Sequence, residues 1–120
     1  MLGFALACLG DLAAAQTIQS FEWVEGGATP VARITFAANV RYLRQAPAQS
    51  MATDLSQVGF QIVNADEAVL NQANEEGKRL AADGAKPRID LTYFPNPKSQ
   101  TKLLSLRFVD KVLLQARQGP

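Results

Sequence analysis

Apolar and polar residues alternate with a period of two along much of this chain, and this pattern constrains its fold more than any other feature. From Ala32 to Tyr42 every even-numbered position is apolar, whereas most odd-numbered positions are polar. Successive side chains of a strand point to opposite faces, so the run predicts strand structure with one buried face. The small residues Ala37–Asn39 could divide it by a tight turn, and Pro47 ends it.

The same alternation recurs in other stretches of strand length. Ser20–Glu25 precedes the turn pair Gly26–Gly27, and its Phe21 and Trp23 are expected in the core rather than on a sugar-stacking surface. The inward positions expected in the later strands are Val58, Phe60, Ile62, Ile89, Leu91, Tyr93, Leu104, Leu106, Phe108, Val112, Leu114 and Ala116. Short polar breaks and the absence of alternating helices predict a mainly β fold, either an antiparallel β-sandwich or a small open barrel.

One segment departs from the strand pattern. Residues 64–84 are rich in helix formers, with acidic residues early, Lys78 and Arg79 late, and Gly84 placed as a helix stop. These features predict one short helical insertion at about 66–80. An ordered loop is the alternative, because the apolar stripe is thin and Gly77 disfavours a helix interior.

The first 15 residues have the features of a signal peptide. An apolar run from Leu2 to Leu9 is followed by Ala13–Ala15, a small-x-small pattern, before Gln16. A basic region is missing, so the signal peptide is expected to be incomplete at its start; a buried N-terminal strand or helix is the alternative. Residues 16–120 then form a single β-domain without cysteine, expected in the periplasm or secreted from a bacterial envelope.

The strand pattern around Phe36 returns around Phe108. Superposing the two residues also superposes Val40 on Val112, with expected turns at Ala37–Asn39 and Val109–Lys111. Two ordinary strands would give a similar match, and an internal duplication cut short at the C-terminus is the other interpretation. A duplication would leave the last strand without a neighbour. The chain is then expected to be the N-terminal part of a longer protein, or to form a homodimer through that edge.

Charge and composition exclude several functions. The chain has no histidine, which removes Ser-His-Asp triads and the usual zinc sites. No glycine-rich phosphate loop occurs, and 12 basic against 11 acidic residues give no basis for nucleic-acid binding. We therefore expect no metal, no cofactor, no nucleic-acid partner and no membrane span in the mature chain.

Two sets of charged residues remain as candidates. A small exported carboxylate-dependent hydrolase, glycosidase-like, would draw its acid and base from Asp66, Glu67, Glu75 and Glu76. The preferred interpretation is not an enzyme but a binding module, because arginines project from the outward positions of the strands and suit carboxylates. The candidate ligand-binding residues are Arg33, Arg41, Arg44, Arg88, Arg107 and Arg117. A solubilised sheet face in a purely structural spacer domain would show the same arginines.

The motifs Ile34-x-Phe36, Val40-x-Tyr42 and Arg88–Leu91 resemble those of AMIN-type β-modules, small domains near the N-termini of bacterial envelope proteins. More specifically, residues 18–120 are similar to the N-terminal region of proteobacterial envelope proteins that continue into tetratricopeptide repeats. The resemblance implies a non-catalytic envelope module that binds peptidoglycan, another envelope polymer or a protein partner and so localises a larger protein. No tetratricopeptide signature occurs in this sequence.

Overall fold

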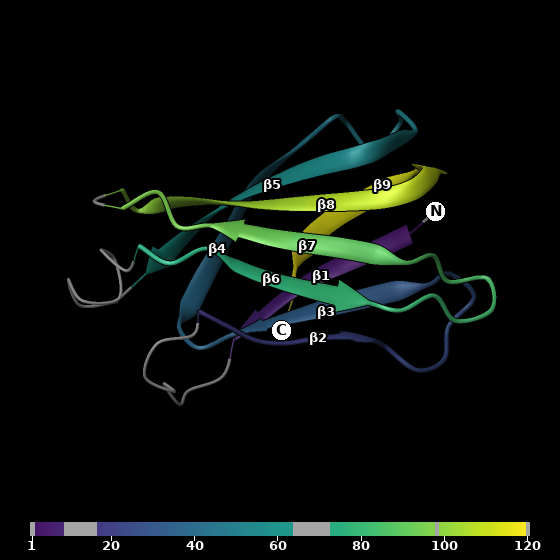
Figure 1. The fold of residues 1–120 in the computed structure, drawn as a ribbon, viewed down its shortest axis with the longest axis horizontal. Coiled ribbons are helices and arrows are strands. Elements are labelled where there is room, and N and C mark those ends of the chain that lie inside the picture. Colours follow the sequence, from purple (N-terminus) through teal and green to yellow (C-terminus); the bar gives the residue numbers. More distant parts are fainter. Residues whose placement is uncertain (1, 9–16, 64–72, 98, 120) are drawn as a thin grey trace.

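The computed structural model describes residues 2–8, 17–63, 73–97 and 99–119, and these residues form two packed β-sheets without a helix. The strands are β1 (Leu2–Cys8), β2 (Ile18–Trp23), β3 (Val31–Phe36), β4 (Asn39–Ala46), β5 (Thr53–Val63), β6 (Glu76–Leu80), β7 (Ile89–Phe94), β8 (Thr101–Val112) and β9 (Leu114–Gln118). One sheet has the order β2-β3-β1-β9 and the other β4-β5-β8-β7-β6. Figure 1 shows the five-stranded sheet in front of the four-stranded sheet. The expected β-sandwich is confirmed.

The two sheets differ in strand direction. Every pairing in the five-stranded sheet is antiparallel, as the short connections predict. In the four-stranded sheet β2 and β3 are antiparallel, but β1 lies parallel to both β3 and β9. The antiparallel expectation therefore fails only where β1 enters the sheet.

The core lies between the sheets and contains the side chains that the alternation assigned to it. Phe36, Phe60, Leu91 and Phe108 are all at most 5% exposed and belong to one cluster. The Phe36 and Phe60 rings, which come from different sheets, have centroids 4.9 Å apart, within the range of favourable aromatic pairs. Contact between these two rings joins the sheets at the centre of the molecule.

The chain passes between the sheets at two short breaks. Ala37 and Ala38 separate β3 from β4, so the turn expected at Ala37–Asn39 is confirmed. The turn expected at Val109–Lys111 is wrong, because β8 continues to Val112. From the cross-strand pair Leu55–Arg107 to the cross-strand pair Thr53–Val112, β8 contains more residues than β5 does. The extra residues of β8 form a bulge. The second crossing lies at Leu113 instead.

The expected helix at about 66–80 is wrong over Glu76–Leu80, which form β6. β6 pairs along its whole length with β7, and this tertiary pairing outweighs a helix propensity that amounts to a few tenths of a kcal/mol per residue. The early part of the expected helix, residues 66–72, lies outside the described residues. Gly84, expected to stop the helix, adopts φ 58° in the turn between β6 and β7.

The segment expected to be a signal peptide contains β1, in the middle of the four-stranded sheet. Strand structure at this position is the alternative that the sequence left open, and cleavage after Ala15 stays a prediction. The last strand, β9, does have a neighbour, because it pairs with β1 from Leu114 to Gln118. Among the described residues no helix has the length and apolar character needed to cross a membrane.

Candidate functional site

The six candidate arginines are divided between the outer faces of the two sheets. Arg33 lies on β3 and Arg117 on β9, in the four-stranded sheet, whereas Arg41 and Arg44 lie on the edge strand β4 of the other sheet. Arg88 directly precedes β7 and Arg107 lies on β8. Both strands are interior strands of the five-stranded sheet. The six therefore do not form one site.

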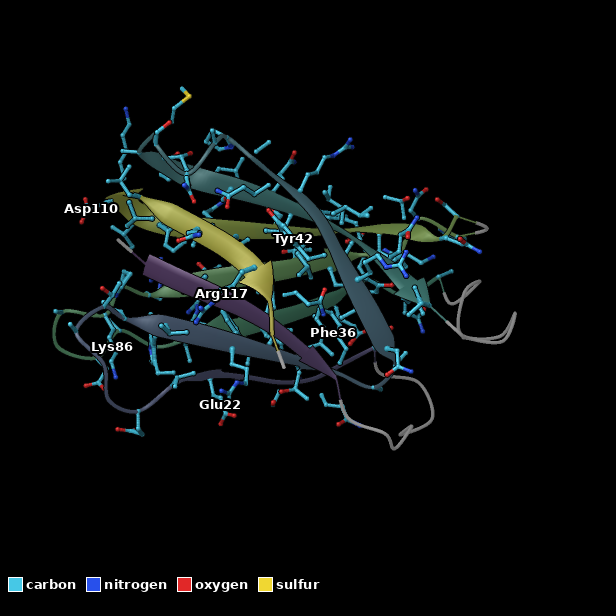
Figure 2. The ribbon with its side chains drawn as sticks, turned by 180° about the vertical axis from the view of Figure 1, so that it is seen from behind. Glu22, Phe36, Tyr42, Lys86, Asp110 and Arg117 are labelled. Carbon is cyan, nitrogen blue, oxygen red and sulfur yellow. The ribbon has the colours of Figure 1, made fainter. Side chains whose placement is uncertain are left out.

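Arg33 and Arg117 belong to one row across the four-stranded sheet. Arg33 pairs with Glu22 on one side and with Ala5 on the other, and Ala5 pairs in turn with Arg117. Paired residues in neighbouring strands project from the same face, so the two arginines are about 10 Å apart at their Cα atoms, two strand spacings. Figure 2 looks onto this face and shows Arg117 over the sheet and Glu22 near its β2 edge.

The edge of β9 that faces away from β1 meets the edge of β4 at a corner of the sandwich. Gln45 of β4 donates from Nε2 to the Leu114 carbonyl oxygen (2.8 Å) and accepts at Oε1 from the Ala116 N–H (2.7 Å). Gln118 of β9 donates to the Val40 carbonyl oxygen (3.1 Å) and accepts from the Tyr42 N–H (2.6 Å). Two side-chain amides thus satisfy backbone groups that would otherwise form an open sheet edge.

These two glutamines place three of the arginines around the same corner. Arg44 precedes Gln45, Arg117 precedes Gln118, and Arg41 lies between the two β4 residues that Gln118 binds. We call these three, together with Arg33 from the same row as Arg117, the arginine corner; its members are Arg33, Arg41, Arg44 and Arg117. Across the part of the chain that the structure describes, no carboxylate forms an ion pair with any of them.

Two details mark individual members of the arginine corner. Arg33 is only partly exposed, and its Nε is buried without a hydrogen-bond partner among the described residues. Arg44 is exposed and extends over Gly59 of β5, because a Cβ at Gly59 would lie 3.6 Å from the Arg44 Cγ. A buried guanidinium nitrogen without an acceptor is costly, so the surroundings of Arg33 favour a negatively charged partner.

Arg88 and Arg107 lie in a different electrostatic setting. Asp90 of β7 accepts a hydrogen bond from Arg79 Nε at 2.7 Å and lies 3.7 Å from an Arg88 nitrogen. Arg107 pairs in register with Asp90 from β8. Asp90 therefore forms ion pairs with Arg79 and Arg88, which leaves Arg88 less available to an anionic ligand than the arginine corner, whereas Arg107 lies beside Asp90 in register without an ion pair to it among the described residues.

Of the four candidate carboxylates, the described residues include Glu75 and Glu76, which lie in different settings. Glu76 accepts hydrogen bonds from the backbone N–H groups of Thr17 (2.8 Å) and Ile18 (2.9 Å), so both of its oxygens hold β2 against β6. Glu75 borders an open hollow of about 400 Å³ on the outer face of the five-stranded sheet. Asp66 and Glu67 lie outside the described residues.

That hollow is mainly apolar and contains no cluster of metal ligands. Phe94, one of its lining residues, is 36% exposed. The hollow is lined by Ala73, Glu75, Phe94, Pro95, Asn96, Pro97 and Leu103. Within the described ranges, no group of three or more acidic or cysteine side chains is placed to hold a metal ion.

Burial raises the pKa of two tyrosines further above neutral pH. Desolvation raises the pKa of Tyr93 to about 12; a hydrogen bond with Thr17 opposes the shift, and the charge of Glu76 adds to it. Desolvation also raises the pKa of Tyr42. Burial lowers the pKa of Lys102, whose Nζ donates to the Asn96 carbonyl oxygen at 3.2 Å. A tyrosine whose pKa is raised this far is a poor general base near neutral pH.

The alternation of apolar and polar residues does not identify the residues that close the sandwich, although the sequence contains a repeated motif at these positions. The motif Arg-Gln-small-Pro occurs twice, at residues 44–47 and 117–120. Its two glutamines are the ones that bind the backbone of the facing strand at the β4–β9 corner. On the opposite side of the sandwich Trp23 Nε1 donates to the Ala81 carbonyl oxygen at 3.0 Å, and Lys86 Nζ lies 5.7 Å from the Trp23 ring centroid. Trp23 packs against the core, as expected.

Comparisons with protein-family models, with curated proteins and with solved structures found no match for this chain.

Proposed function

We propose that this chain is a non-catalytic module of the bacterial envelope, similar to AMIN-type modules, and that the arginine corner binds an anionic envelope polymer. The observation that carries the proposal is the absence of an ion-pair partner for any of the four corner arginines among the described residues. Arginine forks bind carboxylates and phosphates through two parallel hydrogen bonds, and peptidoglycan peptides and other wall polymers carry such groups.

The geometry suits an extended ligand better than a small molecule. The four arginines come from three strands, β3, β4 and β9, and Gln45 and Gln118 fix the relative positions of β4 and β9. A repeating polyanion could contact several guanidinium groups at once, so that individually weak contacts add up. In this proposal the module localises a larger periplasmic or secreted protein.

The alternative of a carboxylate-dependent hydrolase has less support. Both oxygens of Glu76 are engaged by the backbone of β2, which leaves Glu75 as the free described candidate. A glycosidase needs two carboxyl groups facing one bond. The purely structural spacer predicts that the arginine corner has no ligand, and the binding experiment therefore separates it from the present proposal.

The test is cosedimentation of the full chain with purified, insoluble peptidoglycan and with peptidoglycan stripped of its attached anionic polymers. We expect binding that weakens as salt rises. The variant R41Q/R117Q should bind about tenfold more weakly or worse, since each lost charge-assisted hydrogen bond is worth about 1.5–3 kcal/mol. The matched control R88Q/R107Q removes the same charge from the Asp90 region and should bind as the unmodified chain does.

Equal weakening in both double variants would show that only net charge matters and would contradict a site at the corner. Binding unchanged in R41Q/R117Q would contradict the proposal outright. Loss on stripped peptidoglycan alone would assign the attached polymer as the ligand.

A further inference from the structure

β1 occupies the middle of the four-stranded sheet although no hairpin joins it to either neighbour. It pairs with β3 from Gly3–Val31 to Cys8–Phe36, and with β9 from Leu2–Leu114 to Leu6–Gln118, parallel to both. It is the first of the described strands, and the link to the other strands of the sandwich leaves from its C-terminal end. β1 can therefore leave the sheet without any other strand being threaded or crossed.

The two walls of this position are held by contacts that do not involve β1. β3 is paired along its length with β2, from Ile18–Phe36 to Trp23–Ala32. β9 is attached to β4 by the hydrogen bonds of Gln45 and Gln118. Without β1 both walls would stay in place, each with a free row of backbone N–H and C=O groups facing the other.

The walls also specify which side chains a strand between them should carry. A Cβ at Gly3 would lie 3.0 Å from Val31 Cγ2, a tight contact, so the position paired with Val31 favours glycine. Two residues further on, the position of Ala5 is paired with Arg33 on one side and Arg117 on the other. The Arg33 Nε is buried and has no hydrogen-bond partner in the described part of the chain. Alanine supplies no negative charge between these two cations, whereas aspartate or glutamate would.

We propose that the slot between β3 and β9 is a docking site for a strand of a partner protein, and that Leu2–Cys8 fills it only until the signal peptide is removed. The partner strand would add parallel to β3 and β9 and carry Gly-x-Asp or Gly-x-Glu in an apolar, alternating segment. Backbone hydrogen bonds supply the affinity in this mode of recognition, and the flanking side chains supply the specificity. The proposal depends on the expected cleavage after Ala15, but not on polymer binding.

The experiment uses the full chain, produced without export so that residues 1–15 are retained. A protease site is placed between Cys8 and Thr17 and cut, which leaves the Leu2–Cys8 peptide bound without a covalent link. An excess of the same peptide carrying Ala5→Glu is added, and native mass spectrometry measures which peptide occupies the protein. We expect exchange, with the Ala5→Glu peptide preferred about tenfold over the unmodified peptide.

The variant R33Q/R117Q is the matched control, and it should exchange peptides but show no preference for Ala5→Glu. Retention of the original peptide, or an equal preference in both proteins, would overturn the proposal. A second measurement does not need the cut: Ala5→Glu in the intact chain should raise the melting temperature, and Ala5→Lys should lower it. The opposite order would also overturn the proposal. None of these outcomes bears on peptidoglycan binding, which the variant R41Q/R117Q tests separately.

Discussion

Gln45 of β4 and Gln118 of β9 make equivalent pairs of hydrogen bonds across the corner, each to the backbone of the facing strand. Each side-chain amide donates to one carbonyl oxygen and accepts from one N–H of the facing strand. A backbone strand would offer the same pair of groups, so each glutamine substitutes for a strand that the sandwich lacks at this edge. The free edge that an edge-to-edge homodimer through β9 would need is therefore already engaged, and that dimer stays a prediction without structural support.

Removing either amide should destabilise the sandwich, because backbone groups then lose their partners. We expect Gln45→Ala and Gln118→Ala each to lower the free energy of unfolding by about 1–3 kcal/mol, measured by urea denaturation followed by circular dichroism. Gln115→Ala, an exposed residue of the same strand, is the control and should be close to neutral. Equal stability in all three variants would contradict a bridging role for the two glutamines.

Glu76 closes the opposite side of the sandwich, between β2 and β6. Its carboxylate accepts from the N–H groups of Thr17 and Ile18, so Glu76→Ala should cost about 3 kcal/mol in unfolding free energy. Glu76→Gln keeps one acceptor oxygen and should fall between Glu76→Ala and the unmodified chain. Glu75→Ala removes the neighbouring carboxylate and should change stability little; a loss as large as that of Glu76→Ala would show that charge alone is responsible.

The aromatic contact between the sheets should dominate core stability. Phe60 is fully buried, with its ring centroid 4.9 Å from that of Phe36 and 6.0 Å from that of Tyr93. Phe60→Ala should lower the unfolding free energy by about 3–5 kcal/mol, from lost burial and the cavity that remains. Val109→Ala, at a side chain that is 65% exposed, should lower it by less than about 0.5 kcal/mol. Comparable losses at both sites would contradict the assigned core.

Stability should decrease at alkaline pH through Tyr93. Its pKa rises from 10.0 in the unfolded chain to about 12 in the fold, so the folded state holds its proton more tightly. The tyrosine contribution is therefore fully present below pH 10 and is lost between about pH 10 and pH 12, by roughly 2–3 kcal/mol. Tyr93→Phe should be less stable at neutral pH, because the hydrogen bond with Thr17 is lost, but should show a smaller alkaline decline. An unchanged decline would exclude Tyr93 as its source.

Much of the core could be predicted because burial follows a local rule. In strands, inward and outward positions alternate, so Phe36, Phe60, Leu91 and Phe108 could be assigned to one layer without knowledge of the strand order. The same rule placed Arg33 and Arg117 on the outside. It failed at Glu76–Leu80, where helix-forming residues pair with β7, because pairing partners far apart in the sequence decide the conformation of such a segment.

The candidate site depends on relationships that no local pattern contains. Arg117 and Arg41 are far apart in the sequence, and they become neighbours only because the chain crosses between sheets after Phe36 and again at Leu113. Asp90 meets Arg79 for the same kind of reason, since the register of β6 and β7 brings them together, whereas Arg88 lies only two residues before Asp90 in the sequence. The parity of a residue predicts its face, but the identity of its neighbours on that face requires the strand order.

Trp23 is the one tryptophan of the sequence, and its indole nitrogen binds the Ala81 carbonyl oxygen where β2 meets β6. Its fluorescence therefore reports on a single place in the molecule, the junction that Glu76 also closes. An emission maximum that moves to longer wavelength before the circular dichroism of the sheets changes would reveal a state in which this junction has opened while both sheets persist.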